Sequence, residues 1–244
     1  MRTSEIPGPS AGTTLRQHVC SLPQSVAALR DAVEADASLQ QKFVNRHILT
    51  LRHFDASLLR QLFHLAARYE LGDHPDGILA GKILGTLYFN ATREHTFLSA
   101  ASAWKKLGGE VLDFDQYIDE MSLQRYLTAE LAEMINSYTD ITALRLPDRD
   151  TLELNLDYFT VPLINAGNGE DHHPLLAMSD LYTIFKWRPD LLSEESISGK
   201  RLQIVINGNP AQTRAIRSFL NGIAQFPWAV ERIVITGRNA YPLD

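Results

Sequence analysis

Two hydrophobic periods alternate along the chain. Nearly continuous apolar runs of strand length occur six times, at residues 83–89, 110–114, 141–146, 161–165, 202–207 and 232–236. Segments with apolar residues at helical spacing precede and separate these runs, at residues 57–69, 96–107, 123–138, 149–159, 175–187 and 211–225. Strands that alternate with helices form parallel sheets covered by helices on both faces. The pattern therefore predicts an α/β fold.

A polar segment over residues 188–200, which contains Pro189 and Gly199, separates the first four predicted strands from the last two. We expect a domain boundary there. The resulting division is an N-terminal tail with an extra helix, a complete α/β domain and a partial second α/β domain, over residues 1–45, 46–187 and 188–244.

The two ends of the chain differ from the regular middle. Residues 1–14 are rich in Pro, Gly, Ser and Thr, which predicts a mobile tail, and a loose helical period over residues 22–44 predicts one extra helix starting near Pro23. The last two strands and one helix cannot bury both faces of a sheet on their own. Either the second domain is truncated, as in a fragment, or another surface completes it.

Composition narrows the class of protein. The 244 residues are 45% hydrophobic and 21% charged, which is typical of a globular protein, and the net charge of −6 argues against a nucleic-acid binder. A single cysteine, Cys20, excludes an internal disulfide and fits a reducing compartment. No apolar run approaches the roughly 18 residues that span a bilayer, and the start lacks a signal-peptide pattern. We expect a cytoplasmic protein with no membrane partner.

Ligands of open parallel sheets bind outside the carboxyl ends of the strands, so the loops after the strands are the first place to look for chemistry. The first of these loops contains Thr92 and Arg93 just before a predicted helix. Free backbone N–H groups at a helix start and a guanidinium together favour an anion. The alternative is that Thr92 only caps the helix and Arg93 is solvated.

Two later loops add candidates. Arg145 lies near the end of the third predicted strand, where a lone arginine is more often an ion-pair partner than a ligand-binding residue. The loop over residues 165–174 has two Asn and two Gly, which permit tight turns, and ends with His173, which can polarise a carbonyl at a helix start. His172, His173 and Asp171 suggest a metal, but adjacent residues rarely face one ion. No metal and no cofactor is predicted.

Four stretches of this sequence resemble the aspartate and ornithine carbamoyltransferase family. The run VPLINAGNGEDHHPLLAMSDLYTI resembles the region around the family's His-Pro-Thr-Gln motif. HILTLRHFDASLLRQLFHLA resembles the opening helix, and GKILGTLYFNATRE followed by AWKKLGGEVLDF resembles the strand, phosphate loop and first sheet helix. The resemblance covers roughly residues 46–236.

The resemblance implies two α/β domains, with carbamoyl phosphate bound on the first and an amino acid mainly on the second. It implies transfer of the carbamoyl group to an amine in active sites shared between the subunits of a homotrimer. By position, Thr92 and Arg93 match the phosphate loop, and Arg145 and His173 match two catalytic positions. Arg214 is the candidate contact for the carboxylate of the amino acid.

Other motif positions differ from the family pattern. The substituted residues are Ala91, Glu94 and His95 in the phosphate loop, the segment 124–127 in place of a Lys-bearing motif, Leu146 in place of a His, and Leu175 and Leu176 in place of Thr and Gln. A carboxylate at a phosphate site repels the ligand, by about 4 kcal/mol for close charges at an effective dielectric of about 20. Loss of one transition-state donor typically lowers the rate by about 10²–10³.

Two functional hypotheses follow. In the first, the protein is a divergent member of the family without ordinary transcarbamoylase activity, and it acts as a binding or assembly subunit, either in a homotrimer or with another subunit. In the second, the same pocket moves a carbamoyl or other acyl group to the amine of an amino acid. Carbamoyl phosphate or a related small anion is the candidate ligand, and a less phosphate-like, more apolar donor would suit Leu175 and Leu176 in the second hypothesis.

Overall fold

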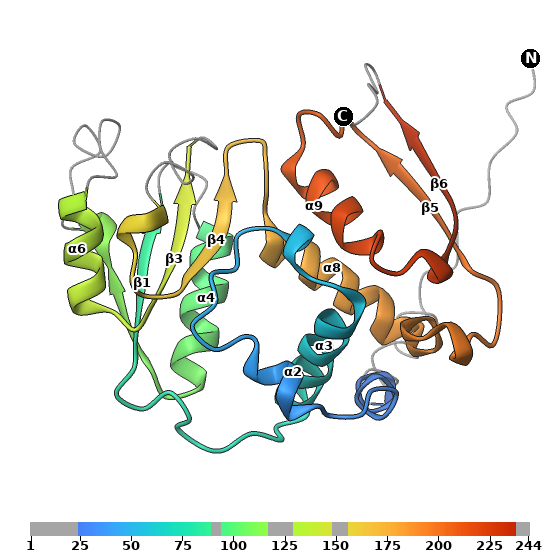
Figure 1. The fold of residues 1–244 in the computed structure, drawn as a ribbon, viewed down its shortest axis with the longest axis horizontal. Coiled ribbons are helices and arrows are strands. Elements are labelled where there is room, and N and C mark those ends of the chain that lie inside the picture. Colours follow the sequence, from blue (N-terminus) through green and yellow to red (C-terminus); the bar gives the residue numbers. More distant parts are fainter. Residues whose placement is uncertain (1–23, 89–93, 117–128, 148–155, 238–244) are drawn as a thin grey trace, which may run out of the picture.

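The computed structural model describes residues 24–88, 94–116, 129–147 and 156–237 (Figure 1). Two parallel sheets carry the fold, and the predicted α/β class is confirmed. The first sheet has the strand order β2-β1-β3-β4, and the second pairs β5 with β6. The strands are β1 (Ile83–Tyr88), β2 (Glu110–Asp113), β3 (Ile141–Leu146), β4 (Leu163–Asn168), β5 (Leu202–Asn207) and β6 (Val230–Thr236).

Helices cover both faces of the first sheet and one side of the second. The α-helices are α2 (Ala37–Gln41), α3 (Ala56–Glu70), α4 (Glu94–Lys106), α6 (Ala129–Tyr138), α8 (Pro174–Trp187) and α9 (Arg214–Ile223). Short 3₁₀ helices are η1 (Leu51–His53), η2 (Phe114–Gln116), η3 (Leu156–Tyr158), η4 (Pro189–Leu192), η5 (Glu194–Ser196) and η6 (Pro227–Ala229). No described helix has the length and the apolar character that crossing a membrane requires.

Local chemistry explains where the main helices begin. The Asp55 carboxylate accepts the backbone N–H of Leu58 at 2.8 Å, so it caps the first turn of α3. Helix α8 begins at Pro174, whose fixed φ and missing N–H suit a first helical position. The predicted segments 123–128 and 149–155, and the tail 1–14 with Cys20 and Pro23, lie outside the described residues.

The prediction of one helix over residues 22–44 is wrong, because the structure has two separate helices in this range. Residues 24–31 are helical, the helix ends there, and α2 is a separate helix. Asp36 separates the two because its carboxylate accepts the N–H groups of Ser38 and Leu39 at 2.8 and 3.1 Å. A carboxylate that caps a new helix start competes with continuation of the preceding helix.

The fourth strand also begins and ends later than the predicted residues 161–165. It runs from Leu163 to Asn168 instead of ending at Asn165. The register between β3 and β4 shifts between Leu144 and Leu146, and Gly167 has φ of +121°, so the strand continues through an irregular stretch that periodicity does not register.

The first sheet is covered on both faces, as predicted. Helix α6 packs on one face, where its Leu131 and Ile135 join Leu87 and Leu144. Helix α4 covers the opposite face, where residues such as Phe97 pack against a second cluster of strand residues. The sheet is therefore the central layer of this unit, and the loops that follow its strands lie at its carboxyl edge.

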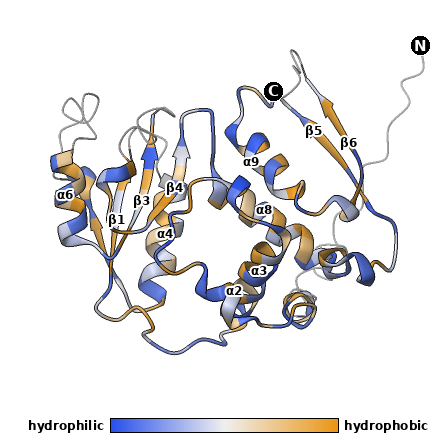
Figure 2. Cartoon of the chain, in the orientation of Figure 1, coloured by the Kyte–Doolittle hydropathy of each residue, from blue (hydrophilic) through white to orange (hydrophobic). Residues whose placement is uncertain are grey.

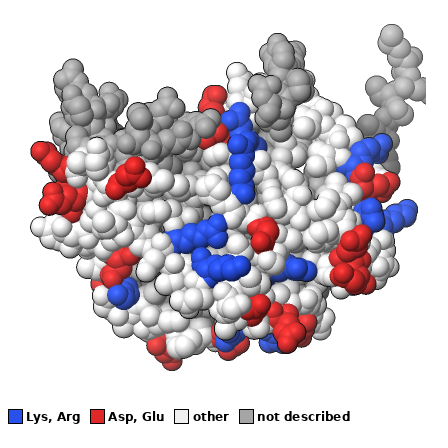
Figure 3. All heavy atoms as spheres, in the orientation of Figure 1, with Lys and Arg blue, Asp and Glu red and all other residues white. Residues whose placement is uncertain are grey.

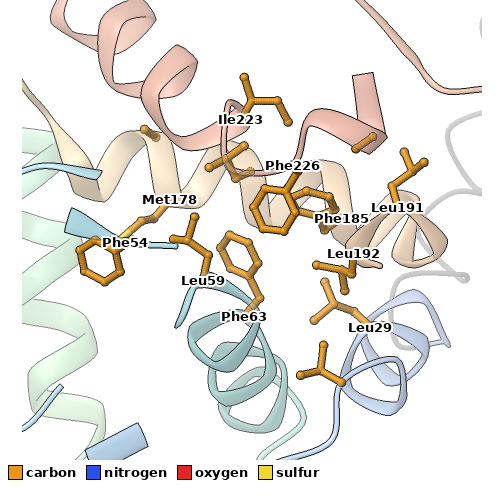
Figure 4. Packing of buried hydrophobic residues seen from close by; sticks show 14 of the residues in the cluster. Leu29, Phe54, Leu59, Phe63, Met178, Phe185, Leu191, Leu192, Ile223 and Phe226 are labelled. Carbon is orange, nitrogen blue, oxygen red and sulfur yellow. The ribbon is translucent and has the colours of Figure 1, made fainter. Parts of the chain in front are cut away.

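The largest hydrophobic core lies away from the first sheet, between helices (Figure 4). It joins the helix at residues 24–31 to α3, α8, α9 and β5. Phe185 is its centre, with ring centroids 5.7 Å from Phe63 and 4.5 Å from Phe226. Residues from all three predicted divisions share this core, and the boundaries at residues 45 and 187 remain a prediction.

The two-stranded sheet leaves apolar side chains uncovered. Strands β5 and β6 consist largely of hydrophobic residues (Figure 2). Among them, Val205 is 70% exposed, Ile233 is 37% exposed and Val234 is 36% exposed. This exposure agrees with the expectation that two parallel strands cannot bury both faces of a sheet.

Candidate functional site

The candidate site lies where the carboxyl ends of β1 and β3 meet. These strands are neighbours although β2 comes between them in sequence, so the strand order reverses at this point, where open α/β sheets bind ligands. Arg145 pairs in register with Tyr88, the last residue of β1. Thr92 and Arg93 follow β1 directly but lie outside the described residues, so their role in binding phosphate stays a prediction.

Arg145 reaches from the end of β3 to the first turn of α4. Its Nη1 lies 3.5 Å from the Thr96 hydroxyl oxygen, to which it donates a long hydrogen bond. The side chain is half-buried between the sheet and the helix. The guanidinium is therefore held at the helix start, where the sequence places the phosphate loop.

The loop between β4 and α8 is held by its own polar side chains. The Asn165 amide nitrogen donates to Asn168 Oδ1 at 3.0 Å, and the Gly167 N–H donates to Asn165 Oδ1 at 2.7 Å. Asn168 Oδ1 also accepts the N–H of His172 at 3.0 Å. The two Asn and two Gly therefore shape the turn, as expected. The turn places His173 directly before the first residue of α8.

Helix α9, which belongs to the part of the chain after residue 188, is bound to this loop by side-chain hydrogen bonds. Arg214 Nη1 donates to the Gly169 carbonyl at 2.7 Å, and a Cβ atom at Gly167 would lie only 3.1 Å from Arg214 Cζ. One turn later, Arg217 Nη1 donates to Asp171 Oδ1 at 3.0 Å. The His173 N–H donates to the Ser218 hydroxyl at 2.8 Å. These contacts bring Arg214 from the second unit into the site on the first.

A cavity of about 520 Å³ lies between α4, the β4–α8 loop and α9. On the face drawn in Figure 3, Lys and Arg side chains are interspersed with Asp and Glu side chains. The cavity brings together three of the predicted site residues, Arg145, His173 and Arg214. The other lining residues are His95, Thr96, Gly169, Glu170, Leu176, Gln212, Thr213 and Ala215.

The imidazole of His173 is neutral at pH 7. Burial, together with the positive charges of Arg214 and Arg145, lowers the pKa of His173 to about 4. Its Nδ1 is buried and has no hydrogen-bond partner among the described residues. A neutral imidazole that lines a cavity beside two guanidinium groups can donate to or accept from a bound polar group without adding charge.

Burial and a neighbouring positive charge also act on Arg214. Partial burial and the nearby charge of Arg145 lower the pKa of Arg214 from its usual value, but the guanidinium stays charged. Two arginines that repel one another at one cavity are stabilised when an anion binds between them. The arrangement is therefore suited to binding a small anion.

Asp171 belongs to an ion-pair cluster beside the cavity. One carboxylate oxygen accepts from Arg217 at 3.0 Å, and the other lies 3.3 Å from His172 Nε2. No group of three His, Cys, Asp or Glu side chains in the described part of the chain is placed to hold a metal ion.

Sequence reasoning did not find Arg217, Ser218, Gln212 and Ala215. A signal was available for Arg217, which lies one helical turn after Arg214 and so on the same face. No sequence signal pointed to Ser218, because its partner is the backbone N–H of His173, 45 residues away. The sequence identifies Leu176 only as a motif substitution, and the structure places it in the cavity wall.

Comparison with known proteins gives the family. Residues 46–186 match the model of the aspartate/ornithine carbamoyltransferase carbamoyl-P binding domain. The aspartate carbamoyltransferase catalytic subunit of Methanoculleus marisnigri is 32% identical over 143 residues, which are 59% of this chain and 48% of that protein. The corresponding subunit of Methanopyrus kandleri is 31% identical over 188 residues, covering 75% and 57%.

Solved structures agree. Trypanosoma cruzi aspartate transcarbamoylase in complex with N-(phosphonacetyl)-L-aspartic acid superposes with a TM-score of 0.68 at 25% identity, covering 85% of this chain and 63% of that one. The chain spans about half the length of the curated relatives it matches. More than half of this chain matches the family model. The protein therefore belongs to the aspartate/ornithine carbamoyltransferase family.

Proposed function

We propose that this protein binds a small anion at the cavity between α4, the β4–α8 loop and α9, and that it lacks ordinary transcarbamoylase activity. It acts as a binding or assembly subunit of the family. Arg145 and Arg214 bind the anion, and His173 contacts its polar group. Thr92 and Arg93 complete the phosphate side of the site, as the resemblance expects.

The observation that carries this proposal is Leu176 in the cavity wall. Leu176 follows His173 by three residues, so both lie on the same side of the first turn of α8. The resemblance expects a glutamine here, whose amide recognises the carbamoyl group. A leucine cannot make that hydrogen bond, and one lost transition-state donor lowers a rate by about 10²–10³.

Steady-state assays with carbamoyl phosphate and either aspartate or ornithine test the catalytic half of the proposal. Enzymes typically turn over at about 1–10³ per second, and we expect no measurable product formation here. Turnover in that range with either amino acid would show that the proposal is wrong.

A thermal-shift titration with inorganic phosphate and carbamoyl phosphate tests the binding half. Saturating anion is expected to stabilise the protein, by about 2.7 kcal/mol at 100 times its Kd. The double variant Arg145→Met/Arg214→Met should lose the shift. The matched control is Arg52→Met, which removes an exposed arginine outside the cavity. An equal shift in all three proteins would place the anion elsewhere.

A second candidate function is an active transferase that moves a carbamoyl or other acyl group to the amine of an amino acid. The neutral imidazole of His173 favours it, because a neutral donor beside two arginines can polarise a carbonyl. Relatives of known structure support an amino acid as acceptor, since Trypanosoma cruzi aspartate transcarbamoylase was solved with carbamoyl phosphate and aspartate. If His173→Ala and Arg145→Ala leave every detected transfer activity unchanged, this candidate is wrong.

We propose further that the protein is cytoplasmic and assembles as a homotrimer through the first domain. The support is the family resemblance. Light scattering should give three times the chain mass of 27.4 kDa. A mass of one chain would contradict the trimer, and a larger mass only after adding another subunit would favour mixed assembly.

A further inference from the structure

Tyr88 contributes a buried hydroxyl that the proposed function does not use. Tyr88 is the last residue of β1 and is only 3% exposed. Its hydroxyl oxygen is buried and has no hydrogen-bond partner among the described residues. Nearly all buried polar groups in folded proteins have such a partner, so an exception calls for a physical reason. One such reason is a group that makes its hydrogen bond only when a ligand is bound.

The strand register places the Tyr88 side chain beside that of Arg145. The two residues pair across the neighbouring strands β1 and β3, about 4.8 Å apart, and their side chains leave the same face of the sheet. Helix α4 covers that face. The Tyr88 ring meets Phe97 of α4 edge-on, with the ring centroids 6.0 Å apart. Arg145 donates to Thr96, the residue before Phe97. The phenol and the guanidinium therefore lie side by side under the first turn of α4.

The charges around the phenol determine what its hydroxyl can do. Burial raises the pKa of Tyr88 to about 12, against the opposing charge of Arg145 and with a further rise from the carboxylates of Asp115 and Asp113. The hydroxyl is therefore protonated at neutral pH. Its oxygen can accept a hydrogen bond from a guanidinium while its proton is donated to a carboxylate. A phenol between a cation and carboxylates is suited to orienting the cation.

The hydrogen bond that Arg145 makes to Thr96 favours a rearrangement when an anion binds. It is 3.5 Å long, at the limit for such a bond, and Thr96 itself lines the cavity. Hydrogen bonds at active sites are often long without a ligand and shorten in the complex. The charge of Arg145 also acts on His173, whose buried Nδ1 has no hydrogen-bond partner in the described part of the chain. Two such buried groups therefore lie close to Arg145, where the anion is proposed to bind.

We infer that Tyr88 is a positioning residue for Arg145. In the anion-bound state the Tyr88 oxygen accepts an N–H of the Arg145 guanidinium, and this hydrogen bond holds the guanidinium toward the anion. The inference rests on the proposed anion site, and it adds a residue that acts through Arg145 and is not among the residues that line the cavity. The hydroxyl then makes the free protein less stable and the complex tighter.

Tyr88→Phe removes only the hydroxyl, and inorganic phosphate is the probe. Without phosphate the variant should melt about 2–4 °C higher than the wild type, because a buried group without a partner is removed. Its affinity for phosphate, measured by calorimetry, should fall about tenfold, which is about 1.4 kcal/mol. A purely structural role of the hydroxyl would change the melting temperature and leave the affinity unchanged.

Two further variants make the result specific. Tyr182→Phe removes a hydroxyl that donates to Glu70 at 2.6 Å, outside the cavity, and it should neither raise the melting temperature nor change the phosphate affinity. Arg145→Lys keeps the positive charge but lacks the planar fork of a guanidinium. In the Arg145→Lys background, Tyr88→Phe should change the phosphate affinity by less than about twofold, because the group that the hydroxyl positions is gone.

The outcomes separate this inference from the proposal on which it rests. If Tyr88→Phe binds phosphate as tightly as the wild type while Arg145→Met/Arg214→Met abolishes binding, the anion site stands and the positioning role is wrong. A Tyr88→Phe protein with both a lower melting temperature and a lower affinity would make the hydroxyl structural and overturn the role. A tenfold loss that persists in the Arg145→Lys background would overturn it too. If the wild type binds no phosphate, both the anion site and the inference are wrong.

Discussion

His173 shows how much of a residue's chemistry is decided by its neighbours. Its imidazole would titrate near pH 6.5 in an unfolded chain, and in the folded protein its pKa is lowered to about 4 by burial and by the charges of Arg214 and Arg145. Its backbone N–H donates to the Ser218 hydroxyl at 2.8 Å, which holds the start of α8, and with it the residue that carries the ring, against α9. The structure therefore keeps a neutral imidazole where two cations would be repelled by a charged one.

This shift makes stability depend on pH. Between pH 6.5 and about 4 the unfolded state binds a proton at His173 that the folded state does not, so the free energy of unfolding falls as the pH falls through this window. The loss from His173 alone is about 3 kcal/mol, at about 1.36 kcal/mol per pKa unit.

Urea unfolding at pH 7, 5.5 and 4 measures this dependence. The curve for His173→Asn should be flatter than that of the wild type by this amount. His53→Asn, at an exposed histidine, should follow the wild type. A wild-type curve that parallels His173→Asn would contradict a buried neutral imidazole.

At the scale of elements, the candidate site depends on the ion pair that binds α9 to the β4–α8 loop, between Arg217 and Asp171. The Asp171 side chain is only 10% exposed, and that of its partner Arg217 26%. Removing one member of a largely buried ion pair leaves the other charge without compensation, and it also releases the helix that carries Arg214.

A double-mutant cycle over Arg217→Met and Asp171→Asn measures this link. We expect each single change to destabilise the protein by about 2 kcal/mol or more, with a coupling energy of about 1–2 kcal/mol between them. The matched cycle is Arg30→Met with Asp31→Asn, whose side chains are 36% and 65% exposed. An exposed pair should couple by less than about 1 kcal/mol. Equal coupling in the two cycles would show that α9 is not held by this pair.

At the scale of the whole molecule, one core joins parts that the sequence separates. Leu29, in the N-terminal helix, is fully buried together with residues of α3, α8 and α9. The helix therefore belongs to the folded body although it precedes the segment that matches the family model, which begins at residue 46. Loss of its packing should be felt by the entire protein.

Leu29→Ala is expected to lower the free energy of unfolding by about 2–5 kcal/mol, the range for large-to-small changes in a core. Leu98→Ala, at a leucine that is 60% exposed, should change it by less than about 0.5 kcal/mol. Denaturant unfolding monitored by tryptophan fluorescence gives both values. If the two variants are equally stable, the N-terminal helix is not part of the cooperative core.

Most of the elements were predictable from sequence because they depend on local pattern. Strand β3 and strand β5 match their predicted ranges, since continuous apolar runs mark buried strands wherever they occur. The end of β4 was not predictable. The polar and glycine residues after Asn165 predict a loop, yet Asn168 pairs with Leu146 of β3 and so belongs to the strand.

The sequence by itself determined the α/β class, the parallel strands and the residue types available at the strand ends, because these follow from the period of apolar residues and from motif spacing. Only the tertiary structure decided which of those residues meet. Arg145, His173 and Arg214 come from two units of the chain and line one cavity because α9 is bound to the β4–α8 loop. Contacts over 45 residues leave no trace in local pattern, since they depend on how the helices pack.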